Sequence, residues 1–306
     1  MRYGAVLPTQ EIGTDPAAIR DFAQTVEGLG FDHLLAYDHV LGASRDGREP
    51  SLTGPYSERD PFHEPLVLFG YLAALTTRLE FATAVLILPQ RQTALVAKQA
   101  AEVSLLSGGR LRLGVGTGWN YIEYEALGMP FASRGARLTE QIRVLRALWR
   151  EPVAEFSGTY HRIDRAGILP LPENPIPIWC GGSSVTAIRR AAEYADGFLF
   201  GSARPEVFDL APRALDMAAA AGRDPGEFGL EAVIDFCAGE AAWEQAAADW
   251  EKAGGTHFSI RTISTAAEWM KIQAPNLGSV REHLAALERF ARVCLLPHRI
   301  CPPPRR

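Results

Sequence analysis

The sequence predicts a single α/β domain built as a closed barrel of eight parallel strands, each followed by a helix. Strand-like apolar runs alternate with amphipathic helix-like runs along almost the whole chain of 306 residues. Glycine-rich segments end the fourth and fifth expected strands. The alternative fold is a doubly wound open sheet, which rarely contains eight strand–helix units with glycine motifs after the fourth and fifth strands. No linker divides the chain. We therefore expect one domain over residues 1–306, with a disordered tail from about residue 295.

The first half of the chain contains four of the expected strand–helix units. Strands are expected at residues 3–7, 31–37, 79–88 and 110–116, and helices at 16–29, 64–76, 93–106 and 133–149. Asp15 is placed to cap the first helix, Pro16 begins it and Gly30 ends it. Gly108 ends the helix before the fourth strand. A polar loop at about residues 42–59 separates the second strand from its helix.

The second half repeats the alternation after one interruption. Residues 152–175 hold four prolines and no long helical pattern, so we expect an insertion there with a short hairpin. Strands are then expected at residues 176–180, 197–200, 229–236 and 256–262. A helix is expected after each of these strands. The first follows the serines at 183 and 184 and ends at residue 194, the second follows residue 205, the third ends at residue 252, and the last covers about 279–293.

Composition excludes several classes of partner. The net charge is -5 and no basic stripe occurs, so no nucleic acid is expected as a partner. No apolar run approaches ~18 residues, so no membrane span is expected. The first residues are too few and too soon broken by Pro8 for a signal peptide. The four cysteines lack metal-ligand spacing, and we expect reduced thiols, no metal and a cytoplasmic location.

The end of the fourth strand offers a place for a flat ligand. Thr117, Gly118 and Trp119 follow directly after Gly116. Glycine lets a ligand approach the backbone, and an indole ring provides a stacking surface. A tight barrel bend with a core Trp119 is the alternative interpretation. The glycines do not form a dinucleotide fingerprint, because Trp119 stands where the third glycine would be.

Asp38 and His39 follow the second strand, at the barrel end where active sites lie. An adjacent carboxylate and imidazole can form a hydrogen-bonded pair that transfers protons near neutral pH. We therefore regard Asp38 and His39 as candidate catalytic residues. The alternative is a capping aspartate beside a packed histidine.

Gly181, Gly182, Ser183 and Ser184 follow the fifth strand and precede a helix. Free backbone N–H groups at a helix N-terminus, flanked by glycines and hydroxyls, bind phosphate well. We predict a phosphate site here, although barrel phosphate sites usually follow strands seven and eight. An ordinary turn with a serine cap is the alternative.

Other catalytic classes lack their motifs. The Gly-x-Ser-x-Gly motif of hydrolases is absent, and the seven histidines are scattered rather than clustered with carboxylates. A glycosidase pair among carboxylates such as Glu123 and Glu125 stays open, because a sequence does not give their separation.

Taken together, these segments resemble the luciferase-like monooxygenase superfamily, and within it the deazaflavin-dependent oxidoreductases. The resemblance runs from residue 1 to about 293. It is carried by residues 38–40, 79–85, 88–89, 97–100, 106–110, 114–119, 123–128, 134–135, 177–184 and 195–197. In combination these segments are specific to the superfamily, but they do not identify a substrate.

The resemblance implies a bacterial-luciferase-like barrel with an insertion before the fifth strand. It implies coenzyme F420, or alternatively FMN, across the strand ends, with hydride transfer at the central ring. Asp38 and His39 would lie near that ring, and residues 181–184 would bind the cofactor phosphate. Thr83, Ala84 and Val85 would make backbone contacts, with a cis peptide between Ala84 and Val85, and residues 117–119 would complete the cofactor site.

Three functions follow from this resemblance. The first is an F420-dependent oxidoreductase acting on a small organic substrate, expected as a homodimer. The second is an FMN-dependent monooxygenase, which inserts oxygen with reduced flavin. The third is a barrel that has lost its cofactor. Sugar-phosphate dehydrogenases of this branch carry a glutamate where this chain has Trp119, so that activity is not expected. The loop at 42–59 and the insertion at 152–175 are expected to form much of the substrate pocket.

Overall fold

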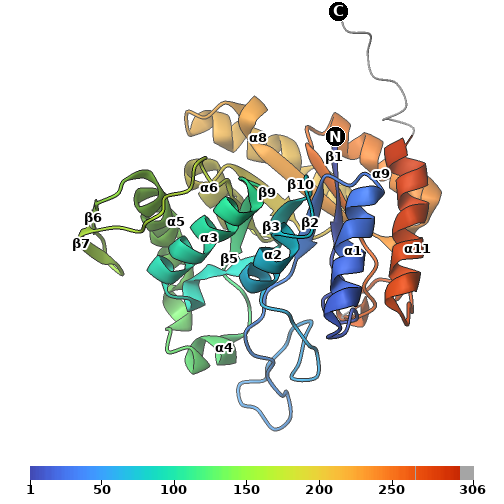
Figure 1. The fold of residues 1–306 in the computed structure, drawn as a ribbon, viewed down its shortest axis with the longest axis horizontal. Helices are drawn as coiled ribbons and strands as arrows, with labels where there is room; N and C mark the ends of the chain where they lie inside the picture. The colour runs from blue at the N-terminus through green and yellow to red at the C-terminus, as the bar shows by residue number, and fades with distance from the viewer. Residues whose placement is uncertain (266, 297–306) are drawn as a thin grey trace, which may run out of the picture.

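A ring of parallel strands surrounded by helices forms the centre of the molecule in the computed structural model, which describes residues 1–265 and 267–296 (Figure 1). The strands of the ring are β1 (Arg2–Val6), β2 (His33–Ala36), β3 (Glu80–Thr83), β4 (Leu86–Ile87), β5 (Leu111–Gly116), β8 (Ile178–Gly181), β9 (Gly197–Phe200), β10 (Gly229–Asp235) and β11 (His257–Arg261). They pair in the order β3-β2-β1-β11-β10-β9-β8-β5, and β3 pairs with β5 to close the ring. β3 and β4 are two parts of one barrel strand, so the nine strands occupy eight positions in the ring. The predicted eight-stranded barrel is confirmed.

The third barrel strand is interrupted. A single strand over residues 79–88 was expected, but Ala84 and Val85 leave the ladder between β3 and β4. The peptide bond between them is cis, as the resemblance implies. Beyond it, Leu86 and Ile87 of β4 pair with Val115 and Gly116 of β5. Ala84 and Val85 line the cavity at the barrel mouth, although the backbone N–H of Ala84 still donates a hydrogen bond of 2.8 Å to the carbonyl of Ala36 in β2.

Helices follow the strands as the sequence pattern predicts. They are α1 (Pro16–Gly28), α2 (Pro65–Ala73), α3 (Thr93–Ser107), α4 (Tyr121–Ala126), α5 (Arg134–Arg150), α6 (Val185–Tyr194), α7 (Pro205–Phe208), α8 (Leu210–Ala220), α9 (Glu240–Lys252), α10 (Ala267–Met270) and α11 (Val280–Phe290). Asp15 caps α1 by accepting a hydrogen bond of 2.9 Å from the backbone N–H of Ala17. Gly108 ends α3 in the left-handed conformation, with φ 66°. The short helix α4 was not predicted.

The insertion forms the expected hairpin. Its antiparallel strands β6 (Ala154–Ser157) and β7 (Arg162–Ala166) lie at the edge of the molecule beside α5 (Figure 1). His161 anchors the hairpin, because its Nδ1 lies 2.8 Å from a carboxylate oxygen of Glu140 and its Nε2 lies 2.7 Å from the hydroxyl of Thr93. The hairpin is thus tied to α5 and α3, in the helical layer.

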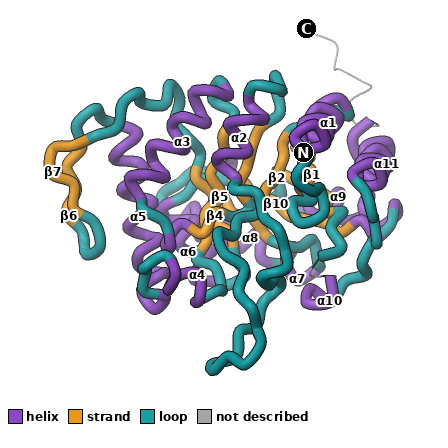
Figure 2. Tube along the Cα trace, turned by 60° about the horizontal axis from the view of Figure 1, so that its bottom comes forward, coloured by secondary structure: helices purple, strands orange, loops and turns teal. Residues whose placement is uncertain are grey.

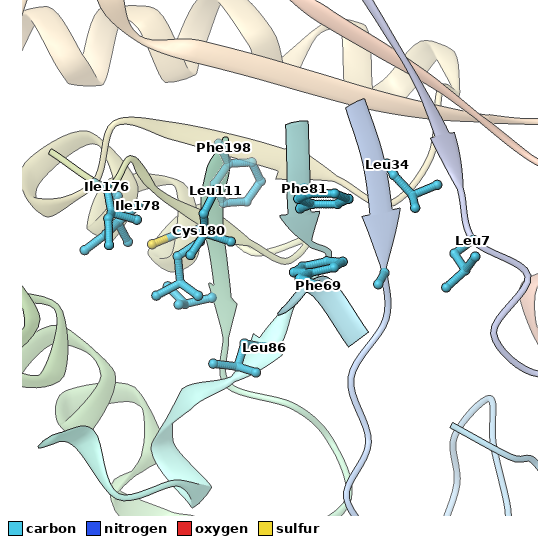
Figure 3. Packing of buried hydrophobic residues seen from close by; sticks show 14 of the residues in the cluster. Leu7, Leu34, Phe69, Phe81, Leu86, Leu111, Ile176, Ile178, Cys180 and Phe198 are labelled. Atoms are coloured by element: carbon cyan, nitrogen blue, oxygen red, sulfur yellow. The ribbon is translucent and has the colours of Figure 1, made fainter. Parts of the chain in front are cut away.

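Apolar side chains fill the space between the strands and the helices. Leu34, Phe81, Leu111, Ile178 and Phe198 come from five neighbouring strands and are fully or almost fully buried (Figure 3). Phe69 of α2 stacks on Phe81, with ring centroids 5.2 Å apart. This layer is the main hydrophobic core and holds the barrel wall against its helices.

The interior of the barrel contains a polar layer below an apolar one. In the polar layer Glu231 accepts a hydrogen bond of 2.6 Å from Arg112, and its other oxygen lies 2.8 Å from His33. The apolar layer lies nearer the carboxyl ends of the strands and consists of Val6, Leu35, Ala82, Leu199, Val233 and Ile263. Every member is at most 6% exposed. This layer closes the barrel below its mouth.

The end of the chain is described only to residue 296. Leu295, where the expected disordered tail begins, is buried in the last helical turn. Residues 297–306, the rest of that tail, lie outside the described residues. None of the described helices is long and apolar enough to cross a membrane.

Candidate active site

A cavity of about 490 Å³ opens at the carboxyl ends of the strands. A second cavity of about 640 Å³ adjoins it and shares part of its lining. Residues common to both are Ala84, Val85, Gly181, Gly182, Ser183, Gly201, Arg261, Trp269 and Met270. We call the first the ring chamber and the second the side chamber. Loops from both halves of the chain surround this mouth, the longest being the one between β2 and α2 (Figure 2).

Most of the predicted site residues lie around the ring chamber. Its lining includes Asp38, His39, Ala84, Val85, Thr117, Gly118, Trp119, Gly181, Gly182, Ser183 and Ser184. Thr83 is the exception: its side chain is fully buried, and its hydroxyl donates a hydrogen bond of 2.6 Å to the carbonyl of Gly114. Thr83 therefore supports the wall without lining the chamber.

The expected pairing between Asp38 and His39 is wrong. Asp38 and His39 both line the chamber, but their polar groups have different partners. Asp38 accepts hydrogen bonds of 2.6 Å from Arg91 and 2.9 Å from the backbone N–H of Ile87. The carboxylate of Asp38 consequently fixes β4 in place and is already engaged away from the imidazole.

His39 has a different carboxylate partner, Glu123 of α4. Its Nδ1 lies 3.1 Å from a carboxylate oxygen of Glu123. An ionised carboxylate only accepts hydrogen bonds, so Nδ1 carries the proton that it donates to Glu123 and Nε2 is left for another partner. The rings of Tyr56, Phe62 and Trp119 surround the imidazole at centroid distances of 5.3, 4.9 and 5.6 Å. His39 is thus held in one orientation at the chamber wall.

Glu123 itself is almost fully buried, and its second oxygen accepts hydrogen bonds from the backbone N–H groups of Val40 and Leu41. Burial opposes its ionisation, but the hydrogen bonds from His39 and from these two backbone groups outweigh burial and lower its pKa. The carboxylate is therefore charged at neutral pH. Asn120 caps α4 through its side chain, which accepts from the N–H of Glu123.

Two glycines leave room for Val85 in the chamber wall. A Cβ atom on Gly116 would lie 2.4 Å from one methyl carbon of Val85, and one on Gly181 would lie 2.6 Å from the other. Both distances are shorter than any normal contact. These two positions therefore require glycine for as long as Val85 occupies the space between them.

The segment after β8 has the features of an anion site. Gly182, Ser183 and Ser184 are exposed at the chamber, directly before the ten residues of α6. Ser184 caps the helix, accepting a hydrogen bond of 3.2 Å from the N–H of Ala187. The first backbone N–H groups of a helix carry partial positive charge and lack partners within the helix. This end of the chamber therefore presents groups that can hold an anion.

Arg261 is a site residue that sequence reasoning missed. It lies at the end of β11, lines both chambers and is only 6% exposed. Its Nε and Nη2 contact one oxygen of Asp235 at 2.7 and 2.6 Å. A signal was present in the sequence, since His257, Ser259 and Arg261 alternate along an otherwise apolar strand and so share one face of it.

The insertion contributes less than predicted. Residues 152–175 are all described, and none of them lines either chamber. The reason is the anchoring of the hairpin to α5 and α3, in the helical layer. The loop after β2 does contribute, through Pro55 and Tyr56.

A parallel barrel with a cavity at the carboxyl ends of its strands and an imidazole in the cavity wall has the general arrangement of a barrel enzyme. The chain belongs to the luciferase-like monooxygenase family, whose model matches residues 1–289. An uncharacterized protein of Mycobacterium tuberculosis is 38% identical over 203 residues, which cover 65% of this chain and 70% of that protein. The pyrimidine monooxygenase RutA of Cronobacter sakazakii is 34% identical over 222 residues. They cover 69% of this chain and 62% of RutA, less than two thirds of its length.

Solved structures share the fold. An F420-dependent secondary alcohol dehydrogenase, solved in complex with an F420-acetone adduct, superposes with a TM-score of 0.74 and 17% identity, covering 94% of this chain and 97% of that one. The F420-dependent tetrahydromethanopterin reductase of Methanopyrus kandleri gives a TM-score of 0.73 and 15% identity, with 97% and 99% covered. Monooxygenase RslO1 of Streptomyces bottropensis gives 0.73 and 18%, also with 97% and 99% covered. Identities this low establish the fold alone.

Proposed function

We propose that this protein is an F420-dependent oxidoreductase that transfers a hydride between the deazaflavin ring and a small organic substrate. The observation that carries the proposal is the arrangement of one continuous chamber. His39, held by Glu123, and Trp119 line it, and so do the exposed groups at the N-terminus of α6. An elongated cofactor with an aromatic ring and a phosphate matches these two kinds of lining.

Each part of the chamber has a separate task in this proposal. The backbone N–H groups of Gly182, Ser183 and Ser184 hold the phosphate, and Val85, seated between two glycines, supports the ring from below. When bound, the deazaflavin supplies or accepts the hydride. Nε2 of His39 holds or moves the proton at the reacting oxygen of the substrate, because Nδ1 is committed to Glu123.

The alternative cofactor is FMN, which would make the protein a flavin-dependent monooxygenase. Its support is the monooxygenase names of RutA and RslO1, which share the family or the fold. FMN requires the same phosphate site and a similar ring surface, so the residues around the chamber serve both proposals. We rank F420 first because the sequence resembles the deazaflavin-dependent branch, and we propose a homodimer on the same ground.

Titration of the purified protein with F420 and with FMN, followed by cofactor fluorescence, tests the proposal. We expect F420 to bind at micromolar concentration and more tightly than FMN. Tighter binding of FMN would replace the first proposal with the second. A barrel that binds neither cofactor at this concentration would refute both and favour a binding or structural role.

A further inference from the structure

We infer that the side chamber binds an uncharged, mainly apolar substrate through a carbonyl-type oxygen, which accepts a hydrogen bond from Nη1 of Arg261. The inference deepens the proposed function, since it names the substrate class of the same active site. It rests on the placement of one buried guanidinium group and on the lining of the chamber around it.

The guanidinium of Arg261 is fixed but incompletely used. Asp235 engages its Nε and Nη2 at 2.7 and 2.6 Å, which holds the planar group in one orientation. Nη1 has only two long contacts, each of 3.4 Å, to the hydroxyl of Tyr37 and the carbonyl of Gly201. Good N–H···O bonds are about 2.9 Å long, so the N–H groups of Nη1 are available to a stronger acceptor.

The surroundings of Arg261 suit an apolar molecule. Apolar side chains line much of the side chamber, namely Leu199, Phe200, Val207, Leu210, Trp269, Met270 and Ile272. Its volume of about 640 Å³ is typical of a site for a small organic ligand. Arg261 is a buried charged donor within this lining, and such a donor orients a ligand by a single polar group.

Charge balance decides between a neutral oxygen and an anion. The buried Arg261 is already neutralised by Asp235, so a bound carboxylate would place a second negative charge near Asp235 without a new counter-charge at that depth. Arg204 and Lys271 also line the chamber, but both are exposed, where water and salt screen them. A carbonyl oxygen accepts the hydrogen bond without this cost.

Three probes that share the tetralin ring system test the inference: 1-tetralone, tetralin and 1,2,3,4-tetrahydronaphthalene-1-carboxylate. Calorimetric titration gives the Kd of each, with and without the cofactor that the protein binds. We expect the ketone to bind roughly tenfold or more tightly than tetralin, the scale of a hydrogen bond from a charged donor, and more tightly than the carboxylate. Equal binding of ketone and tetralin, tighter binding of the carboxylate, or no binding of any probe would overturn the inference.

The double variant Arg261→Gln/Asp235→Asn removes the guanidinium without leaving a buried unpaired carboxylate. We expect it to lose the preference for the ketone, whereas Arg213→Gln, an exposed arginine of α8, retains it. A preference that survives in the folded double variant refutes the role of Arg261. If the double variant does not fold, Arg261→Lys keeps a cation beside Asp235 and must reduce the same preference. Cofactor titration of the wild-type protein tests the proposed function separately.

Discussion

At the scale of single residues, the pairing of His39 with Glu123 gives the sharpest expectation. Glu123→Gln keeps the shape of the side chain but removes the charged acceptor that holds Nδ1 of His39. We expect turnover to fall by about tenfold or more, the scale of a hydrogen bond to a charged group. The measurement is kcat at neutral pH with the substrate found by screening aldehydes, alcohols and enones.

Glu125→Gln is the matched control, because Glu125 is an exposed carboxylate on the same helix. Its kcat should equal that of the wild-type protein. A Glu123→Gln variant whose kcat also equals the wild-type value would show that Glu123 only anchors the backbone of Val40 and Leu41.

Removal of the imidazole itself is a separate test. His39→Ala should lower turnover by ~10²-fold or more, the usual effect of a positioned acid or base. Cofactor affinity should change much less, since the phosphate end of the chamber is untouched. Steady-state kinetics and a cofactor titration give the two numbers. Normal turnover together with a lowered melting temperature would make His39 a packing residue.

At the scale of elements, the N-terminus of α6 can be tested without disturbing the fold. Gly181 is unsuitable for substitution because any side chain there meets Val85. Ser183 is exposed, and an aspartate near a helix N-terminus favours the helix. Ser183→Asp should therefore fold normally, yet lower cofactor affinity more than tenfold because its charge repels the phosphate.

Ser157→Asp, at an exposed position of the hairpin, adds the same charge far from the chamber and should leave cofactor affinity unchanged. Equal affinities for both variants would move the phosphate site to another part of the barrel mouth.

The ion pair between Asp38 and Arg91 is expected to hold β4 on the barrel, because Asp38 also binds the backbone N–H of Ile87. Arg91→Met would leave Asp38, which is 3% exposed, without its cationic partner. Removing one partner of a buried pair costs about 3–5 kcal/mol, so the free energy of unfolding measured in urea should fall by that amount. Arg150→Met, at an exposed position of α5, should change it by less than about 0.5 kcal/mol. Similar losses of unfolding free energy in both variants would contradict a stabilising role for the ion pair between Asp38 and Arg91.

At the scale of the whole molecule, the polar layer inside the barrel makes stability depend on pH. Burial, reinforced by Arg112, lowers the pKa of His257 from 6.5 to about 2. Burial opposes ionisation of Glu80, but Arg112 and His33 lower its pKa from 4.5 to about 2. Below these ordinary values the unfolded chain binds protons that the folded chain does not, so acidification favours unfolding.

We therefore expect full stability above about pH 6.5 and a progressive loss below it, first from His257 and then, below pH 4.5, also from Glu80. Each group contributes up to about 1.4 kcal/mol per pH unit. Urea unfolding between pH 7 and pH 4.5 measures this, and His257→Gln should flatten the slope in that interval. If the substitution left the slope of unfolding free energy against pH unchanged, His257 would not contribute to the pH dependence.

Much of the fold was predictable because its signals are local. The alternation of strand and helix patterns, the cap at Asp15 and the stop at Gly108 all act within a few residues. The cis peptide between Ala84 and Val85 was expected only from the resemblance. The break in the strand was not expected, since residues 84–88 are uniformly apolar. The helix α4 was missed because its six residues are too few to establish a period.

The site was predictable in outline but not in its pairings. Positions after strand ends located the chamber, because a barrel brings those ends together. Glu123, the partner of His39, lies 84 positions further along the chain. The loop after β5 brings its carboxylate to the imidazole, and the sequence does not show the course of that loop. Asp38 was assigned to His39 by adjacency, whereas its carboxylate accepts a hydrogen bond from Arg91, 53 positions further along the chain.

The apolar layer below the mouth also determines the side from which ligands enter and leave the barrel. Leu35, Ala82, Leu199 and Val233 seal the barrel beneath the chamber, so nothing passes through it from below. Every ligand must enter and leave on the same side. If cofactor and substrate occupy the chamber together, the one that lies deeper arrives first and departs last. Initial-rate and product-inhibition kinetics should accordingly follow an ordered sequential scheme, and a random-order pattern would require an opening elsewhere in the wall.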